Sequence, residues 1–501
     1  MRKIILSAGA FASLAAAPPP PSPIEAVTQR HARPDAPGCA VATRSGESVE
    51  QAAFGQAELE HPIANTPLTI FEAGSVAKQF TAGAALLLVA DGKLKLDDDI
   101  RRYVPELPDY GSPIQVTHLL SHTSGLRDWG AVARLGGWER GERAHTNGDA
   151  LRIIARQRAL NYPPGTEYSY TNSGYTLLAV LVERVSGKSL ASFTHDRIFA
   201  PLGMANTSWR DDFRRVVPGR ATAYAQRKEG GWEEARPFED AHGNGGLLTT
   251  VDDLLRWNEA VDAGRLGTGF AMALETRAML NDGTRIPYAA GVRVASFRGY
   301  PSVSHSGSTG GYRAWLERFP AERLSIAVLC NGASLDAAAI GRELAGAMLP
   351  DAPPAQMVDP PSLEGNWVSV ATGRSLQLRP APAGERSVIH DGDRLVIAGA
   401  DGREEFVRVP AAAAAALEPF VGRYASEEAE AAYDVTVDSA GLRIALVARP
   451  WLTTRLAPSY ADAFEGGDMI ARFDRDAAGR VTTMRIGIPR VRDIAFRRVA
   501  Q

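Results

Sequence analysis

Residues 75–90, SVAKQFTAGAALLLVA, are the stretch that indicates the fold most clearly. Ala, Leu and Val dominate the run and Asp91-Gly92 follows it, so the sequence predicts a buried helix that ends at the glycine. Ser75 begins this helix, and Lys78 lies one turn later on the same face. The chain has six lysines, at positions 3, 78, 93, 95, 188 and 228, so a Ser-x-x-Lys pair is a less trivial match here than in a lysine-rich protein.

Two further polar segments lie far along the chain from this helix. Tyr170-Thr171-Asn172 follows a Pro-Pro-Gly-Thr turn at 163–166 and precedes a predicted helix at 175–185. His305-Ser306-Gly307 ends a predicted strand at 302–306. Each segment alone also fits a structural role, as a helix cap, a surface turn or a buried strand histidine. Their joint occurrence makes them one candidate site.

The residue types in these segments suit nucleophilic catalysis. Ser75 at a helix N-terminus is the candidate nucleophile, because backbone N–H groups there favour developing negative charge. Lys78 could accept a proton if it were neutral, or hold a neighbour in anionic form. Tyr170, with its pKa lowered by Lys78, could take the serine proton and pass it to the leaving group. Asn172 could hydrogen-bond both Lys78 and a substrate amide.

The third segment is expected to form the opposite wall of the site. Gly307 would let a substrate lie along the strand edge, and His305 would line the wall. The N–H of Ser308 is the candidate second donor of an oxyanion hole, beside the N–H of Ser75.

Together these segments resemble the β-lactamase-type serine hydrolases of the Tyr-x-Asn branch, which includes class C β-lactamases, DD-peptidases, esterases and D-aminopeptidases. Other stretches fit the same family: 118–126 (HLLSHTSGL), 201–204 (PLGM) and 245–250 (GGLLTT). The resemblance implies an acyl-enzyme on Ser75, with Lys78 and Tyr170 as the proton-transfer pair, and structural roles for His118 and His122. It covers a hydrolase domain at 24–350, with one antiparallel sheet assembled from both ends of the domain and helices between.

The third segment departs from the β-lactamase pattern, which usually has Lys-Thr-Gly where this chain has His-Ser-Gly. Histidine is mostly neutral at pH 7, so we expect weak β-lactam hydrolysis and a substrate without the carboxylate that penicillins present. A His-x-Gly segment resembles the D-aminopeptidases, which carry two small β-barrels and a barrel loop that selects a free amine. By that resemblance the loop would be 459–468, with Asp462 as a substrate-binding residue beside Glu465 and Asp468.

The C-terminal part of the chain reads as β structure. Five prolines between positions 350 and 361 predict a linker at 351–361. Residues 363–369 (LEGNWVS) and 420–426 (FVGRYAS) form a weak repeat, separated by an alanine run at 411–416. We therefore expect two small barrels, at 362–410 and 417–501, or one combined barrel at 362–501. The predicted fold class is multidomain α+β: a β-lactamase-like domain followed by an antiparallel, lipocalin-like β-barrel region.

The N-terminus predicts export. Residues 1–15 have a basic start, a short apolar run and small residues at a cleavage site, which is typical of a signal peptide, and 16–23 would be a Pro-rich spacer. The run is too short to span a bilayer and no cysteine follows closely, so no stable membrane anchor is expected. The protein would be periplasmic or secreted. Whether Cys39 and Cys330 form a disulfide stays open at this level.

Composition and missing motifs exclude several functions. The net charge is −3 with scattered basic residues, which argues against nucleic-acid binding. There is no Gly-x-Ser-x-Gly elbow, no His-Glu-x-x-His and no nucleotide loop, so an α/β-hydrolase, a zinc hydrolase, a metal and a cofactor are not expected. The predicted partner is a small peptide, amide or ester, most like a D-aminopeptidase substrate. Alternatives are a carboxylesterase, a DD-peptidase or weak β-lactamase, and a non-catalytic penicillin sensor or peptidoglycan-binding protein. The oligomeric state stays open.

Overall fold

The computed structural model describes most of the chain. The described residues are 21–138, 142–349, 357–359, 361, 363–378, 381–382, 386–399, 402–411, 416–439 and 441–499. The predicted signal peptide at 1–15 and most of the spacer and the linker lie outside them. Within the described part of the chain, no helix has the length and apolar character needed to cross a bilayer.

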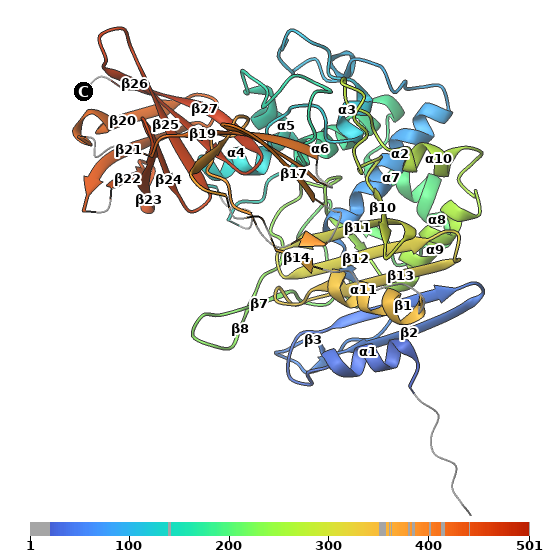
Figure 1. The fold of residues 1–501 in the computed structure, drawn as a ribbon. Coiled ribbons are helices and arrows are strands. Elements are labelled where there is room, and N and C mark those ends of the chain that lie inside the picture. Colours follow the sequence, from blue (N-terminus) through green and yellow to red (C-terminus); the bar gives the residue numbers. More distant parts are fainter. Residues whose placement is uncertain are drawn as a thin grey trace, which may run out of the picture.

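A six-stranded antiparallel sheet forms the centre of the first domain, and it joins strands from both ends of that domain, as predicted (Figure 1). Its order is β10 (Arg293–Phe297), β11 (Tyr300–Thr309), β12 (Tyr312–Phe319), β13 (Leu324–Cys330), β1 (Cys39–Ser45) and β2 (Ser48–Phe54). Cys39 and Cys330 lie opposite each other on β1 and β13 and form a disulfide. The pairing that the sequence left open is therefore a bridge between adjacent strands.

Helices cover both faces of this sheet (Figure 1). On one face, α1 (Pro23–His31) and α11 (Ala337–Met348) pack over a core that includes Trp315, Phe319 and Ile340. On the other face lie α2 (Lys78–Ala90) and α9 (Val251–Asp262). The hydroxyl of Thr250 caps α9 by accepting the N–H of Asp253 at 3.3 Å.

The remaining helices form a lobe beside α2. The predicted helix at 175–185 is part of α6 (Asn172–Ser186), which packs on α2 and ends at Gly187 in the left-handed conformation. Around these two lie α3 (Val116–Leu120), α4 (Trp129–Leu135), α5 (Asn147–Ala155), α7 (Leu190–Thr194), α8 (Ala200–Leu202) and α10 (Phe270–Glu275). Short strands add β3 (Gln56–Glu58) with β4 (Ile63–Ala64), β5 (Phe71–Glu72) and β6 (Ser208–Trp209) on β9 (Leu247–Thr249), and β7 (Tyr224–Gln226) with β8 (Trp232–Glu234).

The C-terminal residues form a closed antiparallel barrel, so the predicted fold class is confirmed. The strands are β20 (Gly422–Ser426), β21 (Ala431–Asp438), β22 (Gly441–Leu446), β23 (Arg449–Tyr460), β24 (Ala463–Gly466), β25 (Met469–Arg475), β26 (Val481–Ile488) and β27 (Val491–Arg498). Inward-facing side chains such as Tyr424, Ile444 and Phe496 fill its interior.

The predicted first barrel, at 362–410, has a different form. Its described residues make a four-stranded sheet of β15 (Asn366–Ser369), β19 (Gly402–Val409), β18 (Arg394–Gly399) and β17 (Arg386–Asp391), in that order. A further pair joins β14 (Met357–Val358) to β16 (Ala381–Pro382). In the described part of this segment these strands form an open sheet and not a closed barrel.

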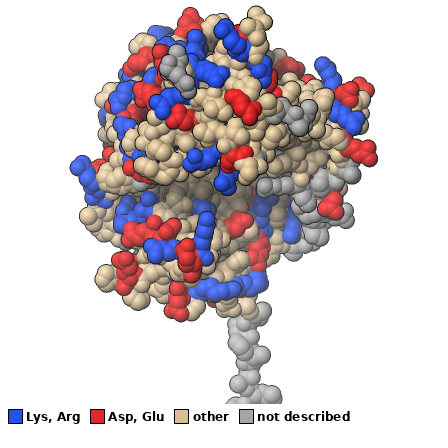
Figure 2. Space-filling view, turned by 90° about the vertical axis from the view of Figure 1, so that its left-hand side faces the viewer, with Lys and Arg blue, Asp and Glu red and all other residues tan. Residues whose placement is uncertain are grey.

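The barrel is packed directly on the helical lobe (Figure 1). Arg127 and Glu428 form a buried ion pair across the junction, with Nη1 and Oε2 2.7 Å apart. The hydroxyl of Tyr433 donates to the carbonyl of Leu135 at 2.8 Å. Figure 2 shows acidic and basic side chains interspersed on one face of the molecule, with a hollow across its middle. The two domains are therefore in direct contact, through a buried ion pair and a hydrogen bond.

Candidate active site

Ser75 lies in a tight turn that leads into the core helix. The turn, η1 (Gly74–Ala77), is a single 3₁₀ turn continued by α2. Gly74 has a φ of 51°, and a Cβ there would come within 2.6 Å of the backbone nitrogen of Ser308. Likewise, a Cβ on Gly307 would lie 2.0 Å from the carbonyl oxygen of Ala73. The two glycines therefore let β11 approach the turn closely, which places the backbone of Ser308 beside that of Ser75.

Lys78 is fully buried and surrounded by acceptors. Its Nζ lies 3.1 Å from Ser75 Oγ, 3.0 Å from Asn172 Oδ1 and 2.6 Å from the carbonyl oxygen of Asn244. The amine also lies 4.8 Å from the centre of the Tyr170 ring. These contacts fix Nζ against the serine hydroxyl, at a distance suited to proton transfer.

Tyr170 presents a buried hydroxyl that has no hydrogen-bond partner among the described residues. Burial raises the pKa of Tyr170 above its ordinary value, while Ser75 and the nearby cation of Arg490 act in the opposite direction with smaller effect. The sequence-based expectation of a lowered pKa was wrong, because the cost of burying a phenolate exceeds the attraction of the neighbouring charges. Tyr170 is thus a protonated phenol in the free site, suited to relay a proton and not to stand as a phenolate.

His305 is held neutral by its surroundings. Its Nδ1 lies 2.6 Å from the carbonyl oxygen of Ser306 and its Nε2 lies 2.8 Å from the hydroxyl of Tyr288. Because a carbonyl only accepts, Nδ1 carries the proton and Tyr288 donates to Nε2. Burial, together with the charge of Lys78, lowers the pKa of His305 to about 3. This wall of the site therefore presents a neutral imidazole at the position where a β-lactamase has a lysine.

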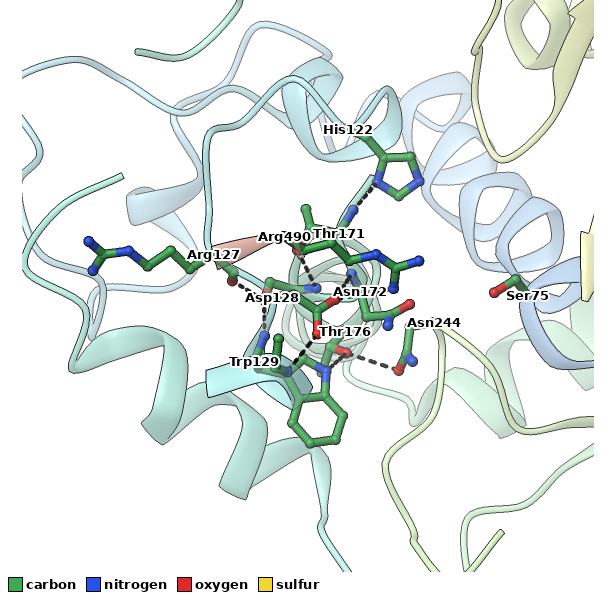
Figure 3. Close-up of polar contacts among 12 residues, drawn as sticks. Ser75, His122, Arg127, Asp128, Trp129, Thr171, Asn172, Thr176, Asn244 and Arg490 are labelled. Carbon is green, nitrogen blue, oxygen red and sulfur yellow. Dashed lines mark hydrogen bonds and ion pairs between the residues drawn. The ribbon is translucent and has the colours of Figure 1, made fainter. Parts of the chain in front are cut away.

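A hydrogen-bond network behind the site fixes the acceptors of Lys78 (Figure 3). Asp128, the cap of α4, accepts the backbone N–H of Asn172 at 2.7 Å. The hydroxyl of Thr176 on α6 donates to Asn244 Oδ1 at 3.0 Å. The starts of α4 and α6 and the loop at Asn244 are thereby tied together, so that the lysine is positioned from three sides.

The two histidines of the 118–126 stretch have packing contacts. His118 Nδ1 accepts the N–H of Gln115 at 3.1 Å at the start of α3. The ring of His122 packs on Tyr170 with ring centres 4.1 Å apart, and burial keeps the pKa of His122 well below its ordinary value. His122 thus packs against Tyr170 as a buried, neutral ring.

One cavity of about 430 Å³ collects most of the predicted residues. Its lining consists of Gly74, Ser75, Tyr168, Tyr170, Asn172, Asn244, Gly245, Tyr288, Arg293, His305, Ser306, Ser308, Thr309 and Arg490. Lys78 lies behind this wall through its contact with Ser75. The volume is within the range of small-molecule sites.

The predicted barrel loop at 459–468 is not part of this cavity lining. Asp462 pairs with Arg475 at 2.8 Å, Asp468 pairs with Arg134 at 2.7 Å, and Glu465 accepts from Ser375. These acids stabilise the barrel and its junctions, so the proposed role of Asp462 in substrate binding has no support in the geometry. A different barrel hairpin, the turn between β26 and β27, brings Arg490 into the cavity.

Sequence reasoning missed Arg490, Arg293, Tyr288 and Asn244. Asn244 precedes the Gly245-Gly246 stretch that was noted as a family marker, so a local signal existed there. Arg490 stands in a barrel turn, Ile488-Pro489-Arg490-Val491, that has no feature to distinguish it from the other hairpin turns. Only the closed barrel and its docking orientation place it at the site.

Comparison with known proteins agrees with this geometry. A family model described as beta-lactamase matches residues 24–347. A D-aminopeptidase of Gluconobacter oxydans is 32% identical over 72% of this chain and 68% of its own length. A D-aminopeptidase of Brucella canis is 29% identical over 92% of this chain and 96% of its own. Among solved structures, an octameric penicillin-binding protein homologue from Pyrococcus abyssi shares the fold, with a TM-score of 0.58, 22% identity and coverage of 95% and 98%.

The chain belongs to the β-lactamase family. Within that family it is a serine hydrolase of the peptidase or amidase kind. The likeness to the Brucella relative runs through both the hydrolase domain and the C-terminal barrel region, so it extends well beyond the segments around Ser75.

Proposed function

We propose that this protein hydrolyses amide bonds on the carbonyl side of D-amino acid residues, as a D-aminopeptidase does. The observation that carries the proposal is the contact of Lys78 Nζ with Ser75 Oγ at 3.1 Å, inside a cavity that Tyr170 and Asn172 also line. The relatives that match nearly the whole chain are D-aminopeptidases, which supports this substrate class over esters.

The geometry supports a mechanism through an acyl-enzyme. Ser75 Oγ would attack the substrate carbonyl carbon while its proton passes to the neutral amine of Lys78, and Tyr170 would relay a proton from there toward the leaving amine. The N–H groups of Ser75 and Ser308 would stabilise the oxyanion of the tetrahedral intermediate. Collapse breaks the C–N bond, and the leaving amine takes the proton. Water then attacks the Ser75 ester and gives its proton back to the serine oxygen as the acid is released.

The neutral His305 explains why β-lactams are poor candidates. A penicillin carboxylate would meet no cation at the position of His305, because burial keeps the imidazole uncharged. We expect nitrocefin hydrolysis to be slow in comparison with the cleavage of a D-amino acid amide. A rate on nitrocefin equal to that on the amide would argue for a β-lactamase.

We further propose that the protein is exported. The basic and apolar pattern at 1–15 supports a cleaved signal peptide. The disulfide between Cys39 and Cys330 supports an oxidising compartment. N-terminal sequencing of protein recovered from a periplasmic fraction should give a chain that begins near Ala16, and recovery of intact protein in the cytoplasm alone would refute the export.

The direct test is release of p-nitroaniline from D-alanine p-nitroanilide by the wild type and by Ser75→Ala. The wild type should cleave the D isomer faster than the L isomer, and the variant should be inactive although folded. Equal rates on both isomers, or no release by the folded wild type together with fast cleavage of short-chain p-nitrophenyl esters, would replace this proposal by a carboxylesterase.

A further inference from the structure

The turn between β26 and β27 holds Arg490 at the active site in a constrained conformation. Arg490 has a φ of 67°, which is uncommon for a residue with a side chain. Its carbonyl oxygen accepts the N–H of Asp128 at 3.2 Å and Asn161 Nδ2 at 3.0 Å. Both donors belong to the hydrolase domain, so the barrel hairpin is anchored beside the start of α6. Strained backbone that is held in this way is concentrated at functional sites.

The side chain of Arg490 extends from this anchor toward the side of the site on which Ser75 lies (Figure 3). Its guanidinium lies 4.9 Å from the centre of the Tyr170 ring and is 45% exposed. The nearest acid, Asp128, is 3.9 Å away and already accepts the N–H groups of Asn172 and Ala131. Beyond the ion pair with Asp128 and the contact with Tyr170, the guanidinium makes no hydrogen bond to another residue of the described part of the chain, and Arg490 lines the cavity.

The charged side chains that line the cavity are basic. Arg293 on β10 lines it together with Arg490, and Lys78 lies behind Ser75. No Asp or Glu is present among the described residues that line it. An ammonium group of a substrate therefore meets no carboxylate there, whereas a carboxylate meets a bidentate donor in Arg490.

We propose that Arg490 binds a free carboxylate of the substrate, and that the preferred substrates are short D-peptides with an unblocked C-terminus. The inference rests on the proposed function and specifies its substrate class. In an aminopeptidase reaction on a dipeptide, the carboxylate belongs to the leaving residue, which departs with its proton on the amine. The barrel thus provides, through Arg490, the cation that His305 does not. This proposal replaces the sequence-based expectation of a substrate without a carboxylate.

The test compares D-alanyl-D-alanine with D-alanyl-D-alaninamide, which differ in the terminal carboxylate. The wild type should favour the acid in kcat/KM by about 10- to 100-fold, mainly through KM, as expected for a charge-assisted pair. Arg490→Gln should abolish the preference, and Arg490→Lys should retain part of it. The matched control is Arg485→Gln on the adjoining strand β26, where the arginine pairs with Asp474 outside the cavity lining and the preference should persist.

A role of Arg490 that acts only through Tyr170 predicts a different result. In that case Arg490→Gln slows the acid and the amide equally and their ratio stays unchanged, which would overturn the proposal. Equal kcat/KM values for the two dipeptides in the wild type would overturn it as well, while leaving the proposed D-aminopeptidase function intact.

A second assay separates this inference from the proposed function. p-Nitrophenyl acetate is an activated ester that reports on Ser75 whichever amide the enzyme cleaves. D-Alanyl-D-alanine should inhibit its hydrolysis at a concentration about 10-fold or more below that of the amide, and Arg490→Gln should remove the difference. If neither dipeptide is cleaved but the acid inhibits selectively, the D-aminopeptidase proposal fails and the carboxylate site stands. Equal inhibition by both would refute the site.

Discussion

The hydrolase domain and the C-terminal barrel contribute to the same cavity in different ways. Lys78 is completely buried, with three acceptors around its amine, and comes from the central helix of the family domain. Arg490 comes from a turn of the barrel, where the backbone is anchored and the side chain is 45% exposed. Reacting groups need fixed distances, whereas a side chain that contacts different substrates must be able to adjust its position. The difference indicates that the family domain performs the chemistry and the barrel selects the substrate.

The largest effect should come from removing the groups that react. Ser75→Ala and Lys78→Met should each lower kcat/KM for D-alanine p-nitroanilide by roughly 10⁴-fold or more, because nucleophile and proton acceptor act as a unit. The double variant should lose little beyond either single variant. Additive losses, or a Lys78→Met variant within 10-fold of the wild type, would separate the two residues and weaken the role of the family domain.

Removing the hydroxyl of Tyr170 should lower activity without lowering stability. Tyr170→Phe should reduce kcat by about 10²- to 10⁴-fold, the usual contribution of a general acid or base. Its melting temperature should stay equal or rise, because the hydroxyl is buried with no partner in the described structure. Calorimetry and steady-state kinetics on one preparation measure both. A lower melting temperature with unchanged kcat would make Tyr170 a structural residue.

Breaking the domain junction should mainly affect stability. Arg127→Met removes the buried guanidinium and leaves the largely buried Glu428 with the backbone N–H of Arg158, which costs about 3 kcal/mol. The matched control is Arg156→Met, whose pair with Glu430 crosses the same junction at 3.0 Å but is more exposed, and it should cost less than about 1 kcal/mol. Melting temperatures of both variants test this. Equal shifts would show that the barrel is not held by the buried pair.

The smallest effect at neutral pH should come from His305. Its pKa is lowered in the folded protein to about 3, so the fold favours the neutral form. That stability is fully present above the unfolded value near 6.5 and is lost as pH falls through the range from about 6.5 to about 3. His305→Gln should therefore flatten the decline in melting temperature over this range, and the other histidines whose pKa values are lowered by burial, His118, His122, His145 and His242, contribute to the part that remains. Parallel profiles of variant and wild type would contradict a buried neutral histidine.

Much of the hydrolase domain could be predicted from sequence because its signals are local. The apolar run at 75–90 predicts a helix from its own residues. The three polar segments can be recognised from their residue types and order, without knowledge of what packs around them. The pKa of Tyr170 could not be read, because it depends on burial, which the residues next to it in sequence do not reveal. The disulfide could not be assigned either, since it depends on the register of β1 against β13.

The barrel gave the weaker predictions for a related reason. Alternating apolar and polar residues with turn signals indicate β structure. They do not indicate how many strands close into a barrel or which hairpin faces the hydrolase domain. The acidic stretch at 459–468 was therefore placed at the site, whereas Asp462 and Asp468 pair with arginines elsewhere. Arg490 has no local signal, because its position depends on barrel closure and docking together.

In the proposed mechanism the hydrolase domain transfers the acyl group of the substrate to Ser75. Acid-quenching the reaction with D-alanine p-nitroanilide within the first turnover, followed by peptide mapping and mass spectrometry, measures this directly. A mass increase of one alanyl group is expected on the peptide that contains Ser75, absent from Ser75→Ala and still formed in Arg490→Gln. An adduct on any other residue, or undiminished p-nitroaniline release by Ser75→Ala, would contradict it.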